Sequence, residues 1–100
     1  MMESEKKQPN KIEDTTFSIK SETYVSRYGK IKDGEMHLTS EVHGDDFDSE
    51  QHIIFSKADT ERILSMMTLK EFRDFYGKVG TLGLEEFIKE HKLKPNTITI

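Results

Sequence analysis

The dipeptide Asp33-Gly34 lies between two stretches in which apolar and polar residues alternate. A type I′ turn needs positive φ at both central residues, and aspartate followed by glycine adopts that geometry at low cost. A two-residue loop also fixes the register of the two strands that it joins. The predicted pairs on one face of the hairpin are Ile31 with Met36, Gly29 with Leu38, Arg27 with Ser40, and Val25 with Val42.

The other face of this hairpin is polar and is expected to be solvated or to meet a partner. It carries Tyr24, Tyr28, Lys30, His37 and His43. Aromatic side chains in the middle of an open sheet are typical of several RNA-binding folds, where they stack on bases. Such folds also need a basic stripe, and this face borders an acidic segment. We therefore expect no nucleic-acid partner and interpret the tyrosines as partly buried cross-strand packing.

The rest of the chain predicts an α+β fold. Short alternating or β-branched runs flank the hairpin on both sides, and a helical period of apolar residues follows them. Ser56 is a candidate N-cap, Thr68 and Glu71 form a capping box, and Pro95 must follow the last helix. The prediction is a four-stranded antiparallel meander sheet (about 15–56) covered on one face by three short helices (about 57–67, 69–77 and 83–92), with a short C-terminal strand (96–100).

The 100 residues have room for one domain, which we place at 15–100. Residues 1–14 have Ile12 as their one aliphatic residue apart from the starting methionines, which predicts a flexible polar tail. There is no cysteine, which excludes disulfides, thiolate zinc sites and cysteine nucleophiles. Neither a signal peptide nor a membrane-spanning stretch is visible, so the expected location is cytoplasmic and no membrane partner is expected.

The negative charge is concentrated in one segment. Residues 1–50 carry a net charge of −5 and residues 51–100 carry +1, and seven acidic residues between Asp33 and Glu50 meet no lysine or arginine. Such a segment favours encounter with a basic protein. The predicted partner-binding residues are Glu41, Asp45, Asp46, Asp48 and Glu50, together with Phe75, whose helix carries more aromatic surface than one stripe can bury.

The segment from His43 to His52 has a second interpretation, as a metal site. Its weak candidate ligands are His43, Asp46, Asp48 and His52, since clustered oxygen and imidazole ligands hold cations. A calcium-loop pattern starting at Asp46 is incomplete, because Gln51 replaces its glycine and Lys57 its final glutamate. An ordinary solvated hairpin loop explains the segment better, so no cofactor is predicted.

No catalytic constellation is visible. The four histidines stand in no recognisable triad or metalloprotease motif, and no glycine loop of the phosphate-binding type follows a strand. No motif points to a known family. The chain is therefore interpreted as a non-enzymatic regulator or inhibitor that binds a basic protein through an acidic hairpin surface. The alternatives are a homo-oligomeric structural module, such as a homodimer, and a metal-dependent enzyme or metal-binding protein using the His43 to His52 loop.

Overall fold

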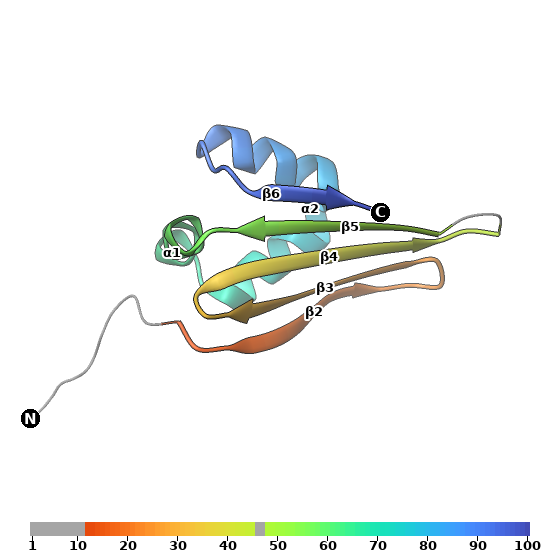
Figure 1. The fold of residues 1–100 in the computed structure, drawn as a ribbon, viewed down its shortest axis with the longest axis horizontal. Coiled ribbons are helices and arrows are strands. Elements are labelled where there is room, and N and C mark those ends of the chain that lie inside the picture. The colour runs from red at the N-terminus through yellow and green to blue at the C-terminus, as the bar shows by residue number, and fades with distance from the viewer. Residues whose placement is uncertain (1–11, 46–47) are drawn as a thin grey trace, which may run out of the picture.

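A computed structural model describes residues 12–45 and 48–100. Five antiparallel strands form one sheet in the order β2-β3-β4-β5-β6 (Figure 1). Their bounds are Thr15–Ser21 for β2, Val25–Lys32 for β3, Glu35–His43 for β4, Asp48–Phe55 for β5 and Asn96–Thr99 for β6. The predicted four-stranded meander with an added C-terminal strand is confirmed as a five-stranded α+β arrangement.

The β3–β4 hairpin has the predicted turn and register. Asp33 and Gly34 both have positive φ, 53° and 85°, as a type I′ turn requires. Ile31 pairs with Met36, and the predicted pairing continues to Val25 with Val42. The turn sequence therefore predicts the register of β3 and β4 correctly.

The last strand lies at the edge of the sheet. β6 pairs with β5 alone, and the pairing runs from Ile54 with Asn96 to Gln51 with Thr99. Ile100 continues it, because its amide donates to the carbonyl of Glu50 at 2.8 Å and its carbonyl accepts from the Glu50 amide at 3.2 Å. The sequence predicts this strand without giving its place in the sheet, and the structure places it at the edge.

Two helices follow the strands where the sequence predicted three. α1 spans Lys57–Met66, and α2 spans Leu69–Glu90. The break expected between the second and third helices is a kink within α2 at Gly80, whose φ of 73° and ψ of −168° are not helical. The residues on either side are helical, so Gly80 bends the helix and does not open a loop.

Both predicted helix N-caps are present. The Ser56 hydroxyl accepts from the Asp59 amide, and Thr68 and Glu71 form a complete capping box. In that box the Thr68 amide donates to the Glu71 carboxylate at 2.8 Å, and the Glu71 amide donates to the Thr68 hydroxyl at 3.1 Å. These bonds satisfy backbone donors that a helix start otherwise leaves free.

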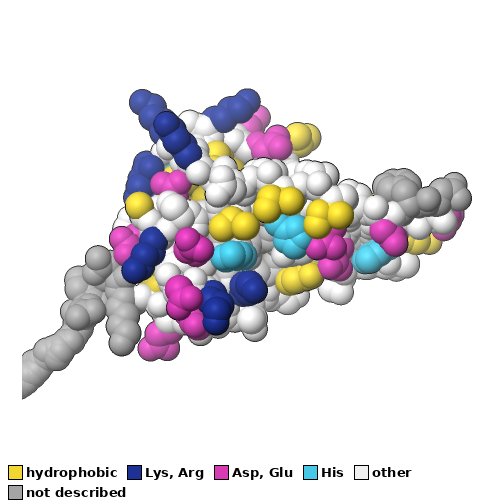
Figure 2. Space-filling model, in the orientation of Figure 1, with side chains coloured by type: hydrophobic (Ala, Val, Ile, Leu, Met, Phe, Trp, Pro, Cys, Tyr) yellow, Lys and Arg dark blue, Asp and Glu magenta, His cyan; other side chains and the backbone are white. Residues whose placement is uncertain are grey.

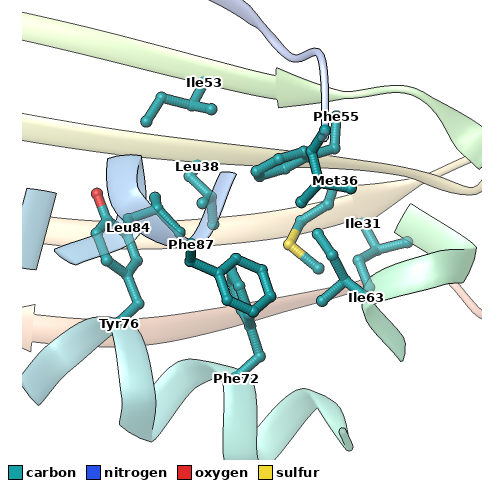
Figure 3. Packing of buried hydrophobic residues seen from close by; sticks show 11 residues of the cluster. Ile31, Met36, Leu38, Ile53, Phe55, Ile63, Phe72, Tyr76, Leu84 and Phe87 are labelled. Atoms are coloured by element: carbon teal, nitrogen blue, oxygen red, sulfur yellow. The ribbon is translucent and has the colours of Figure 1, made fainter. Parts of the chain in front are cut away.

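The core lies between the sheet and the helices. From the sheet it takes Ile31, Met36, Leu38, Ile53 and Phe55, and from the helices Ile63, Phe72, Tyr76, Leu84 and Phe87, joined by Leu93. Figure 3 shows the helix side chains pointing toward the strand residues. Eleven buried hydrophobic residues make a small core, so each position contributes a large share of the stability.

Two contacts extend the core toward β2. The Phe17 ring lies over Gly29, where an added Cβ would come within 2.5 Å of the ring. A glycine in a central strand therefore makes room for an aromatic side chain from the edge strand. Ile12 packs against the core, and the Asp14 carboxylate accepts from the Asp33 amide at 2.9 Å. Residues 1–11 of the predicted tail lie outside the described residues.

The two faces of the sheet differ. Both helices lie behind the sheet in Figure 1, and the face turned toward the viewer carries no helix. Figure 2 shows that this face presents histidine, acidic, basic and hydrophobic side chains together. In the described part of the chain, no helix has the length and apolar character needed to cross a membrane.

Candidate functional site

The open face is organised in three rows that run across the strands. The first, the lysine row, consists of Thr16, Lys30 and His37, which are partners in neighbouring strands. The second, the tyrosine row, consists of Ser18, Tyr28, Thr39 and His52. The third, the acidic row, consists of Ser26, Glu41 and Glu50. Alternation along each strand places these residues on the face away from the core, so the face grades from cationic to anionic.

The acidic row places two carboxylates directly opposite each other. Glu41 of β4 is the cross-strand partner of Glu50 of β5. Beyond them His43 pairs with Asp48, and the imidazole lies 3.4 Å from the Asp48 carboxylate and 3.6 Å from that of Glu41. Like charges that face each other across a sheet destabilise it. This end of the sheet therefore carries a repulsion that its folding does not require.

Tyr28 and His52 partly relieve that repulsion. The Tyr28 hydroxyl donates to Glu41 at 2.8 Å, and the His52 Nε2 contacts the Glu50 carboxylate. The hydrogen bond to Glu41 is the main reason that the pKa of Tyr28 is raised, and the charges of Glu41 and Glu50 add to the effect. The negative charges of Glu41 and Glu50 thus both disfavour ionisation of the Tyr28 hydroxyl.

A groove of about 620 Å³ lies over the first two rows. Its lining includes Thr16 and Ser18 from β2, Tyr28 and Lys30 from β3, His37 and Thr39 from β4, and His52 from β5. Thr39 is only 8% exposed and forms the floor, with its hydroxyl 3.3 Å from the Nδ1 of His52. The volume is in the range of small-molecule sites.

The structure brings together most of the predicted partner-binding residues. Glu41, Asp48 and Glu50 lie on the open face, at the end where β4 connects to β5, and Asp45 is exposed in that connection. Asp46 lies outside the described residues. Phe75 is on the opposite side of the sheet, half-buried, with its ring centroid 5.3 Å from that of Phe87. Phe75 therefore packs beside the core and is not continuous with the acidic residues.

The weak metal candidates do not gather around one point. His43 contacts Asp48 and Glu41, whereas His52 lies in the tyrosine row and contacts Glu50 and Thr39. Within residues 12–45 and 48–100, no group of three or more histidine, aspartate or glutamate side chains has the spacing to hold a metal ion.

The groove is the feature that sequence reasoning did not find. Tyr28, Lys30 and His37 stood out on the polar face of the hairpin, but Thr16, Ser18 and His52 join them only through the pairing of β2 and β5. The β2–β3 pairing has an irregularity between Ser18 and Lys20, and no short turn motif fixes the β4–β5 register. The alternation of residues within β5 was the one signal available for placing His52 on the open face, because Ile53 beside it belongs to the core face.

Comparison of the chain with models of protein families, with curated proteins and with solved structures gives no match.

Proposed function

We propose that the protein is a non-enzymatic binding module that docks a basic protein surface on the acidic end of its open face. The acidic end consists of Glu41, Asp45, Asp48 and Glu50. The observation that carries the proposal is the Glu41–Glu50 pair, in which two carboxylates face each other across neighbouring strands. A lysine or arginine of a partner placed between them removes the repulsion, which makes binding more favourable than the contact alone.

Apolar surface beside the acidic end supports the same proposal. Tyr28, Ile98 and Ile100 are 42%, 49% and 75% exposed. Ile98 is the cross-strand partner of His52, so this apolar surface adjoins the tyrosine row. Interfaces combine a desolvated apolar centre with charges that select and orient the partner. The open face offers both within four neighbouring strands, β3 to β6.

The test compares two triple variants that remove the same charge. Glu41→Gln, Asp48→Asn and Glu50→Gln neutralise the acidic end, and Glu85→Gln, Glu86→Gln and Glu90→Gln neutralise exposed positions of α2. Each variant and the wild type capture proteins from a nuclease-treated lysate at low and high salt. A partner identified this way is then purified, and its affinity for the three chains is measured directly.

The proposal predicts that one partner binds the wild type and the α2 variant with similar affinity, and that salt weakens both of these complexes. The acidic-end variant is expected to bind the same partner at least tenfold more weakly. Equal affinity for all three chains contradicts the proposal. Circular dichroism of each variant confirms that the fold is retained.

A second candidate function, self-association, is favoured by the contrast between the two sheet edges. β2 has a pairing irregularity and a Lys20–Glu22 ion pair at 3.7 Å, both of which discourage pairing with another strand. Residues 96–100 carry no charged side chain, and Ile98 and Ile100 are exposed there. Antiparallel pairing of two β6 edges therefore suits a homodimer.

Sedimentation equilibrium distinguishes this candidate from the first. A homodimer through β6 predicts that the wild type dimerises at micromolar concentration and that Ile98→Lys is monomeric. A wild-type chain that stays monomeric at high micromolar concentration excludes it.

A further inference from the structure

The groove over the lysine and tyrosine rows shares Tyr28 with the surface proposed to dock a basic protein, and its other lining residues have no part in that docking. Its floor is the buried hydroxyl of Thr39, and the rings of Tyr28 and His52 come from the strands on either side of that floor. A planar ring that lies over this floor would contact both aromatic side chains, and we call this position the ring slot.

Both walls of this slot are held in place before any ligand arrives. The Tyr28 hydroxyl is bound to Glu41, and the His52 ring is held by Glu50 on one nitrogen and Thr39 on the other. A ligand that enters does not have to order these side chains, which lowers the entropy cost of binding. The ring nitrogens of His52 are occupied by these contacts, so the imidazole offers its flat surface to a ligand.

The lysine row supplies the charged end of the groove. Lys30 and His37 are cross-strand partners, and Thr16 is the partner of Lys30 on its other side. Among the described residues no carboxylate lies within 4.0 Å of the Lys30 ammonium, and the nearest ion pair in this row is His37 with Glu35 at 3.6 Å. An ammonium, an imidazole and a hydroxyl at one end of a groove are donors suited to an oxyanion.

The acidic row fixes the direction of such a ligand. Successive rows are two residues apart along the strands, or about 6.8 Å. An anion at the lysine row is therefore about 6.8 Å from the ring slot, and one at the opposite end would meet Glu41 and Glu50. The groove thus distinguishes the two ends of a ligand by charge.

We propose that this groove is a small-molecule site for a planar ring that carries one oxyanion, with the ring over Thr39 and against Tyr28 and His52, and the oxyanion at Lys30, His37 and Thr16. A carboxylate and a phosphate are the two sources of that oxyanion. A groove of about 620 Å³ is too large for an inorganic anion alone, so both halves of the ligand contribute to affinity.

The test uses the full chain and four probes that separate ring from charge. The probes are 2-naphthoate (ring and carboxylate), adenosine 5′-monophosphate (ring and phosphate), 2-naphthylmethanol (ring alone) and inorganic phosphate (anion alone). Each is titrated into ¹⁵N-labelled protein, and amide shifts give the site and the dissociation constant. The proposal predicts that naphthoate, the monophosphate or both cause saturable amide shifts at Lys30, His37, Thr39 and His52. Naphthylmethanol and inorganic phosphate are each expected to bind at least tenfold more weakly.

Two variants test the assignment of residues. Lys30→Gln is expected to weaken the ring-bearing oxyanion about tenfold and to leave naphthylmethanol unchanged, whereas Lys89→Gln on exposed α2 changes neither. Thr39→Phe raises the floor of the groove and is expected to abolish binding of both ring ligands with Lys30 still in place.

The proposal is overturned if neither ring-bearing oxyanion shifts the groove amides at millimolar concentration. It is also overturned if naphthylmethanol binds as tightly as naphthoate, or if the two lysine variants weaken binding equally. These outcomes do not affect the proposed docking of a basic protein, because Lys30→Gln leaves Glu41, Asp45, Asp48 and Glu50 of the acidic end unchanged.

Discussion

At the scale of single residues, one hydroxyl joins α1 to the sheet. Thr60 is fully buried, and its Oγ1 accepts from the Met36 amide at 3.0 Å and donates to the Phe55 carbonyl at 3.4 Å. Met36 follows the hairpin turn, so this bond fixes where the helix crosses β4. Backbone donors in a core need partners, and losing one leaves an unsatisfied group.

We therefore expect Thr60→Val, which keeps the shape of the side chain and removes the hydroxyl, to lower the free energy of unfolding by about 1–3 kcal/mol. Thr60→Ser keeps the hydroxyl and is the matched control, with a smaller loss that reflects one missing methyl group. Urea denaturation followed by circular dichroism measures both. Equal losses for the two variants would show that packing, and not the hydrogen bond, holds α1 in place.

The buried Tyr76 makes stability depend on pH in the alkaline range. Burial raises the pKa of Tyr76 above its usual value of about 10, and the Arg27 guanidinium, 5.8 Å from the ring centroid, opposes the shift in part. Below pH 10 both the folded and unfolded chains keep the proton. As the pH rises above 10 the unfolded chain loses it first, so the free energy of unfolding falls.

Tyr76→Phe is expected to flatten that alkaline decline, because the variant has no proton to lose at this position. Tyr24→Phe, which removes a hydroxyl from an exposed side chain, should keep the wild-type slope. Denaturation midpoints at a series of pH values above 9 measure the difference. A Tyr76→Phe curve parallel to that of the wild type contradicts the assignment.

At the scale of elements, the kink of α2 depends on Gly80. Its φ of 73° with ψ of −168° lies in a region that is essentially restricted to glycine, and an added Cβ would meet no atom within 4 Å. The requirement for glycine is therefore conformational and not steric. The kink lets the second half of α2 place Leu84 and Phe87 in the core before the chain continues to β6.

Gly80→Ala is expected to destabilise the protein by about 1–3 kcal/mol, although alanine is the better helix former. Because a straighter α2 misplaces the chain entering β6, the Ile100 amide should also exchange faster with solvent. Lys78→Ala, at an exposed helical position two residues earlier, is the control and should be nearly neutral. A Gly80→Ala chain as stable as this control would show that α2 tolerates a straight course.

The same elements show what the sequence could predict. Asp33-Gly34, Ser56 and the Thr68–Glu71 box act within a few residues of themselves, and the predicted hairpin register and helix starts are confirmed. The gap predicted between the helices at 69–77 and 83–92 contains Gly80, but whether a glycine ends or bends a helix depends on the core that the second half of the helix meets. Predicting the groove requires the registers of β2 and β5 in the sheet. Long-range packing sets those registers, so the sequence alone did not show that these residues lie together.

At the scale of the whole molecule, the helices cover one end of the sheet better than the other. Ile31, Met36 and Phe55 are at most 2% exposed near the hairpin turn, whereas Val25, Val42 and Ser49 are only half-buried on the same face near the acidic end. In Figure 1 the β4–β5 hairpin extends beyond the helices. Local stability follows buried apolar contact, so the end that carries the acidic residues is the less stable one.

Native-state hydrogen exchange should therefore show a gradient along β4. The Met36 and Leu38 amides are expected to exchange only through global unfolding, and the His43 amide, which donates to the Tyr24 carbonyl at 2.8 Å, through local opening. Thr60→Val should speed exchange at Leu38 by the factor that its global destabilisation predicts, and leave His43 nearly unchanged. If His43 followed the global rate, the acidic end would be as rigid as the core. A partner would then meet a preformed surface, and binding would lack the ordering cost that a locally opening hairpin imposes.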